Sequence, residues 1–268
     1  MSRRRGGVVR AGQALGATLR RAPAPAVLSV SLLGWTIMVW LTSMSAAHPH
    51  TALVVQGGAG HVGHATGAVT HLPPGLVPTL GMAMWLAMVL AMSPLLLLRE
   101  VSHLWRGSLR RTRRLTLLVF TSGYGLVWLL GGLVALPFAH ALGDSRLLIG
   151  LTVVAVLVWQ CSPLRQACLN VCHRTPPLRV FGAAARADAW RYGVVAGSAC
   201  AASCGPIMVL VLLATEAHLA AMSVATTVLV IERYRPARRP RWRIPFAPAR
   251  PEHVALPFGP QVEQDLAW

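Results

Sequence analysis

Sulfur-containing side chains recur every four residues in two of the most apolar stretches of the chain. These stretches read GMAMWLAMVLAMSPLLLL at 81–98 and GSACAASCGPIM at 197–208. Residues four apart share one face of a helix, so each stretch predicts a stripe of sulfur atoms. Thiolate and thioether ligands select Cu(I) among the physiological metals. The residues of the two stripes are Met84, Met88 and Met92 in the first, and Cys200, Cys204 and Met208 in the second.

Histidine gathers in a segment with no acidic or basic side chain, between 47 and 76. Neutral imidazole is a common ligand for copper, zinc and nickel, and short histidine-rich tracts indicate metal capture. A glycine-rich loop that contains histidine without binding metal is the alternative. The candidate ligands of this segment are His48, His50, His61, His64 and His71.

A third group of sulfur atoms lies in WQCSPLRQACLNVCHRTPP at 159–177. Ser162 followed by Pro163 favours a helix start, and the prolines at its far end favour a stop. The predicted amphipathic helix buries Leu164, Ala167, Cys168, Val171 and Cys172, and turns Arg165, Gln166, Asn170 and Arg174 outward. Packing alone explains Cys168 and Cys172. Together with Cys161 and His173 they are also candidates for a metal exit site.

Long hydrophobic segments must position these residues. The chain has 268 residues, of which 54% are hydrophobic and only 12% are charged. A membrane helix needs about 20 apolar residues to cross a bilayer core of ~30 Å. The composition predicts an all-α integral membrane protein, a bundle of about six transmembrane helices with an amphipathic cytoplasmic helix between spans four and five. The expected spans are 27–46, 77–98, 115–138, 146–162, 193–213 and 217–231.

Arginine placement predicts the orientation of these spans. Of the 25 basic residues, all arginine, 24 fall on one side of a six-span arrangement and only Arg146 on the other. Because basic residues accumulate on the cytoplasmic side, both termini are expected inside a bacterial inner membrane. The expected parts are a basic cytoplasmic segment 1–26, a membrane domain 27–232 with the histidine-rich outer loop 47–76, and an arginine- and proline-rich cytoplasmic tail 233–268. A long basic segment favours an uncleaved anchor over a cleaved signal peptide for the first span.

The two sulfur stripes belong to spans that run in opposite directions, so their depths can be compared. Counted from the outer side, Met208 is expected near Met84, Cys204 near Met88, and Cys200 near Met92. Six sulfurs would then form a ladder if the two helices adjoin. The alternative is packing, because methionine fills irregular cores and small residues allow helices to approach closely.

Other functional classes find little support. The chain has no Walker loop, dinucleotide glycine pattern, Cys-x-x-Cys pair or HExxH motif, so we expect no enzymatic activity. A thiol redox role for Cys200 and Cys204 is disfavoured because a straight helix holds them poorly for a disulfide. The arginines lie between apolar runs, which indicates a membrane rather than a nucleic acid as partner. Glu216, near the outer end of the sixth span, is the one acid that could lie at membrane depth, with His218 as its neighbour, and the favoured alternative is a loop glutamate in water.

Four blocks of the sequence resemble a bacterial family of predicted metal-binding integral membrane proteins, some of whose members are labelled copper chaperones. The blocks are WLAMVLAM at 85–92, GYGLVW at 123–128, QCSPLRQACLNVCHRTP at 160–176 and CAASCGPIM at 200–208. The resemblance implies that Cys200, Cys204 and Met208 are motif positions. The chain departs from the pattern where Ser93 replaces a methionine, where Ser203 and Gly205 replace a cysteine and a tryptophan, and where Ala217-His218 replaces Met-Asn.

These patterns predict a membrane protein that binds or relays a soft metal, most simply copper, captured from the outer face. Zinc, or no metal, remains an alternative to copper. The alternative function is a non-catalytic scaffold or assembly subunit of a larger membrane complex. Its expected partners are the lipid bilayer and a membrane or extracytoplasmic protein.

Overall fold

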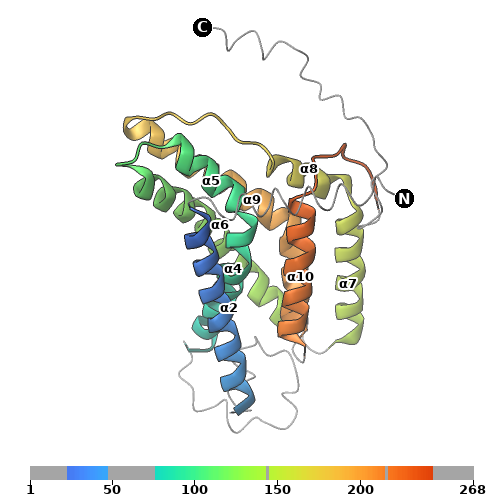
Figure 1. Cartoon of the computed structure of the whole chain (residues 1–268). Helices are drawn as coiled ribbons and strands as arrows, with labels where there is room; N and C mark the ends of the chain where they lie inside the picture. Colours follow the sequence, from blue (N-terminus) through green and yellow to red (C-terminus); the bar gives the residue numbers. More distant parts are fainter. Residues whose placement is uncertain (1–22, 48–75, 143–144, 215–216, 244–268) are drawn as a thin grey trace, which may run out of the picture.

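The computed structural model describes residues 23–47, 76–142, 145–214 and 217–243, and these ranges contain only helices and their connections (Figure 1). Each of the six predicted spans is found as a helix. The helices are α2 (Ala24–Ala47), α4 (Leu76–Leu96), α5 (Leu98–Gly107), α6 (Arg113–Leu142), α7 (Arg146–Cys161), α8 (Pro163–Val171), α9 (Gly182–Leu213) and α10 (His218–Arg233).

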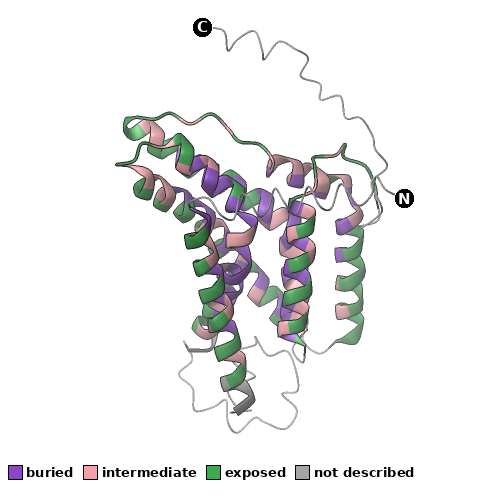
Figure 2. Cartoon of the chain, in the orientation of Figure 1, coloured by how far each residue is buried: buried purple, intermediate pink, exposed green. Residues whose placement is uncertain are grey.

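Four of these helices are long and apolar enough to cross a membrane: α2, α4, α6 and α9. A fifth crossing is formed if α7 and α8, which meet at an angle of 61°, are counted as one broken span. Helix α10 has 16 residues, fewer than the about 20 that a full crossing needs. The outer faces of α2 and α7 expose large apolar side chains, such as Leu32 and Leu147 (Figure 2). Such faces are expected where lipid replaces water as the solvent.

The arginine distribution predicts which end of the bundle is cytoplasmic. At this end, two features of the structure differ from the sequence-based expectation. The basic stretch 99–114 begins inside a helix, α5, because Leu98, Val101 and Leu104 are buried on one face of it. Helix α9 begins at Gly182, eleven residues before the predicted start of its span at 193. Both extra lengths of helix are amphipathic or polar, so an apolar run did not reveal them.

Helix α8 is present as predicted, but it buries a different face. Leu164 is 64% exposed, whereas Arg165 is only 4% exposed, which reverses the predicted orientation. The reason is electrostatic. The Arg165 guanidinium donates to the carboxylate of Glu232 and to the backbone carbonyl of Ser203 at 3.3 Å, so its charge is compensated inside the protein. Cys172 is buried as predicted, and Cys168 is partly buried.

The helices pack in two long pairs, α6 on α9 and α2 on α4, and α10 contacts both α4 and α9. Close backbone approach holds the first pair together. A Cβ atom added to Gly193 would overlap the backbone carbonyl of Phe120, and one added to Gly123 would lie 2.8 Å from the carbonyl oxygen of Trp190. Small residues at such points let helices approach closely in a membrane, where van der Waals packing drives association.

Two buried ion pairs fix α10 to its neighbours. Arg165 of α8 pairs with Glu232, and Arg233 pairs with Glu100 of α5. Arg233 also donates to the backbone carbonyl of Leu96 at 3.3 Å. Four charges are therefore buried in mutual contact where α5, α8 and α10 meet. Removing one partner of a buried pair leaves an uncompensated charge.

The α6–α9 contact predicts a specific effect of adding one methyl group. Gly193→Ala should lower the free energy of unfolding by about 1–3 kcal/mol, because the added Cβ has no room. Gly205→Ala is the matched control on the same helix, since no atom lies within 4 Å of its added Cβ. We expect the control to be neutral or slightly stabilising. Reversible unfolding in mixed micelles, followed by circular dichroism, measures both. Equal stabilities for the two variants would contradict the close packing.

The Arg165–Glu232 pair predicts non-additive mutational effects. Arg165→Leu and Glu232→Leu should each cost about 3–5 kcal/mol, and the double variant should lose much less than the sum. Arg179→Leu is the control, because Arg179 pairs with Asp188 at the surface, where an ion pair contributes little to stability. The same unfolding measurement applies. Additive losses would show that the two side chains do not depend on each other.

Candidate metal site

Both predicted sulfur stripes lie in one buried core. None of the six side chains is more than 3% exposed, and all belong to the cluster of apolar residues between α4, α6, α9 and α10. Helices α4 and α9 do not pack lengthwise on each other. Instead α6 and α10 contact both of them and close the core between them. The residues concerned are Met84, Met88, Met92, Cys200, Cys204 and Met208.

The two cysteines form a thiol pair within a single turn of α9. Their Sγ atoms are 3.4 Å apart, and the Cys204 thiol donates to the backbone carbonyl of Cys200 at 2.8 Å. Both cysteines are free. Two sulfurs bound to one ion at about 2.3 Å each can lie up to about 4.6 Å apart. The pair can therefore share one metal ion after at most a small rotation of the side chains.

Tyr124 of α6 connects this thiol pair to α4. Its hydroxyl oxygen lies 3.3 Å from Sγ of Cys200 and 3.0 Å from Oγ of Ser93. Because Ser93 follows Met92 directly, the Tyr124 hydroxyl places Cys200 at the depth that counting along the two helices predicts for it. Tyr124 is 4% exposed and Ser93 is 7% exposed, so the whole group is shielded from solvent.

Sequence reasoning missed the roles of Tyr124 and Ser93. Tyr124 stands in the GYGLVW block, which was noted for its resemblance and not for its chemistry. Ser93 was noted as the loss of a methionine. In the structure its hydroxyl oxygen is a hydrogen-bond partner of Tyr124. A tyrosine inside an apolar span usually finds a hydrogen-bond partner, and that is the signal that could have identified it.

The candidate exit residues lie at the opposite end of α9 from Met208, in two different environments. Cys172 is buried, and burial raises the pKa of its thiol to about 12, against the opposing charge of Arg233. His173 is half-buried, and burial with the charges of Arg233 and Arg99 lowers its pKa to about 4. The Arg99 guanidinium lies 3.3 Å from Nδ1 of His173 and can only donate, so it occupies the lone pair of this nitrogen.

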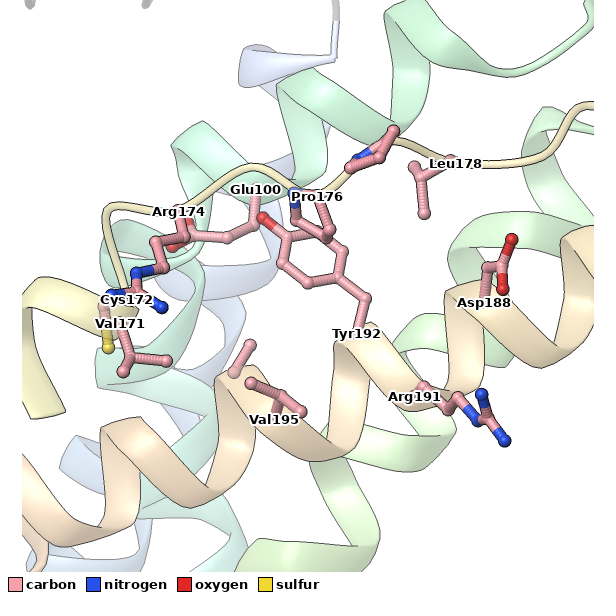
Figure 3. A pocket seen from close by; sticks show the side chains of 12 residues that line it. Glu100, Val171, Cys172, Arg174, Pro176, Leu178, Asp188, Arg191, Tyr192 and Val195 are labelled. Atoms are coloured by element: carbon pink, nitrogen blue, oxygen red, sulfur yellow. The ribbon is translucent and has the colours of Figure 1, made fainter. Parts of the chain in front are cut away.

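A cavity of about 350 Å³ opens beside Cys172, between α5, α9 and the segment that follows α8 (Figure 3). Two of its lining residues, Glu100 and Tyr192, have a buried polar atom, Oε2 and the hydroxyl respectively, with no hydrogen-bond partner among the described residues. Arg174 and Arg191 also line it. Cys172 therefore borders a space that is large enough for a small ligand or for a residue of a partner protein.

The remaining predicted ligands cannot be compared with the structure. The five histidines of the outer loop, and Glu216, lie outside the described residues. Within the described ranges, no three side chains of the histidine, cysteine, aspartate and glutamate types come together in a way that could hold a metal ion. A site in this part of the chain would therefore combine cysteine with methionine, or histidine with methionine.

Comparison with known proteins gives one match. A family model described as PpoB2, copper chaperone, matches residues 82–246, which is more than half of the chain. The matched region begins in α4 and includes the thiol pair, Tyr124, Cys161, Cys168 and Cys172. No curated protein and no solved structure matches. This chain, with its buried thiol pair between methionine-bearing helices, therefore belongs to the PpoB2 copper chaperone family.

Proposed function

We propose that the protein binds Cu(I) inside its membrane domain and relays it from the outer side toward the cytoplasmic side. The observation that carries this proposal is the thiol pair, whose Sγ atoms are 3.4 Å apart in a core that also contains four methionines of the two stripes. Sulfur ligands favour Cu(I) over the harder physiological cations. The family assignment supports copper as the cargo.

The surroundings of the thiol pair suit a bound cuprous ion. Two thiolates around Cu(I) carry one net negative charge, which is costly in an apolar core without compensation. The Tyr124 hydroxyl lies 3.3 Å from Cys200 and can donate a hydrogen bond to a thiolate. The guanidinium of Arg165, which is paired with Glu232, contacts the backbone carbonyl of Ser203, one residue before Cys204.

The proposed path consists of three successive copper-binding sites. The outer histidines capture the ion, the methionine and cysteine stripes hold it, and Cys172 with Cys168 receives it at the cytoplasmic end. Cys172 also lines the cavity beside α5, in which an acceptor could bind next to it. This direction follows from the arginine distribution, with both termini inside and six crossings. In this proposal the segments 1–26 and 233–268 lie in the cytoplasm and 27–232 forms the membrane domain.

Copper content tests this proposal. Purified wild-type protein, loaded with Cu(I) and desalted, should retain close to one copper ion or more per chain. The Cys200→Ser/Cys204→Ser variant should lose the tightest-bound ion, because hydroxyl oxygens are poor ligands for Cu(I). Cys161→Ser is the matched control, since Cys161 is partly exposed and lies at the end of α7.

Elemental analysis against protein concentration gives the stoichiometry. Loss of copper in the double variant with retention in the control supports the proposal. If wild-type protein retains no copper, the metal role fails, and co-purification of a stable membrane partner would then favour a scaffold. Equal copper content in all three proteins would contradict the assignment to the thiol pair.

A further inference from the structure

His218, the first residue of α10, has a ring nitrogen with a free lone pair inside the protein. The residue is 5% exposed, and its Nδ1 lies 3.0 Å from the backbone oxygen of Val211 on α9. A carbonyl oxygen only accepts, so Nδ1 carries the proton and donates. In the neutral ring Nε2 is then an acceptor, and it has no hydrogen-bond partner in the described chain. This arrangement of one nitrogen bonded to a carbonyl and the other free is typical of metal-binding histidines.

Two buried thioethers lie one helical turn deeper than this contact. Met222 follows His218 by four residues on the same face of α10 and is fully buried. Met208 precedes Val211 by three residues on α9 and is 2% exposed. At a helix rise of about 1.5 Å per residue, the two methionines lie about 6 Å and 4.5 Å below the His218–Val211 contact. Because α9 and α10 contact each other and share this core, the two side chains lie at matching depth.

A water molecule is a poor partner for the free nitrogen. A buried water needs two to four polar partners. The described part of the buried core that α9 and α10 share contains Met208, Val211, Leu212 and Met222, whose side chains are apolar, and the Val211 carbonyl already accepts from Nδ1. A soft cation needs only the imidazole lone pair and the thioether sulfurs. Leaving the nitrogen without any partner would cost about 1–3 kcal/mol.

We propose that Nε2 of His218, with the thioether sulfurs of Met208 and Met222, forms a Cu(I) site at the outer end of α9 and α10. This inference rests on the proposed copper function and adds to it a further binding site, distinct from the thiol pair. All three ligands are neutral, so the site holds the ion less tightly than two thiolates do. Cys204 is one turn from Met208 on the same face of α9, so the ion passes from a weaker neutral site to a tighter anionic one.

The test measures this site without the thiol pair, in the full chain carrying Cys200→Ser/Cys204→Ser. Cys168→Ser and Cys172→Ser are added to this background to remove the proposed receiving thiols, and competition with a chromophoric Cu(I) chelator then gives the affinity of the site at His218. His218→Asn should weaken binding at least tenfold, because asparagine can keep the donor to the Val211 carbonyl but lacks the Nε2 lone pair. Met222→Leu, which preserves volume, should also weaken it at least tenfold. Met38→Leu is the control, since Met38 is a fully buried methionine on α2.

The outcomes separate this site from the thiol pair. Weaker binding in the His218 and Met222 variants, with an unchanged Met38 control and unchanged melting temperatures, supports the site. Unchanged affinity in both variants, or no residual copper binding in the background without the thiol pair, overturns it and leaves the thiol-pair proposal standing. If the parent protein with both cysteines also binds no copper, the proposed function itself has failed.

Discussion

The close approach of α6 and α9 is the constraint on which the rest of the core depends. Gly123 and Gly193 bring the two backbones together at a distance that no larger residue allows. Tyr124 follows Gly123 directly, so this contact sets the depth and direction of its side chain. From there its hydroxyl lies within hydrogen-bond distance of Cys200 on α9 and of Ser93 on α4. A wider spacing would separate the thiol pair from the methionine-bearing helix.

A second constraint concerns the buried charges where α10 meets α5 and α8. The carboxylates of Glu100 and Glu232 compensate the guanidinium groups of Arg233 and Arg165. Each of the four buried charges therefore has a partner of opposite sign within the bundle. Arg165 also contacts the turn of α9 that carries the thiol pair. The proposed copper path thus runs from neutral ligands near the outer end of α9 to the thiol pair, whose anionic form binds a monovalent soft cation more tightly.

Much of this arrangement follows from the sequence, because apolar length and a four-residue repeat are local signals. They predicted the helices and the buried positions of both sulfur stripes. The face of α8 was not predictable, because burial of Arg165 depends on Glu232, which lies 67 residues away in the chain. The helical nature of α5 and the bridging role of Tyr124 also depend on contacts between distant segments. His218 carried no local signal of metal binding beyond its residue type.

X-ray absorption spectroscopy of the Cu(I)-loaded wild-type protein tests the central claim most directly, because it reports the atoms bound to copper. We expect the atoms bound to copper to be mostly sulfur, and we expect much of that sulfur to be lost in the Cys200→Ser/Cys204→Ser variant. A first shell made only of nitrogen and oxygen would contradict a cuprous site in the buried sulfur core.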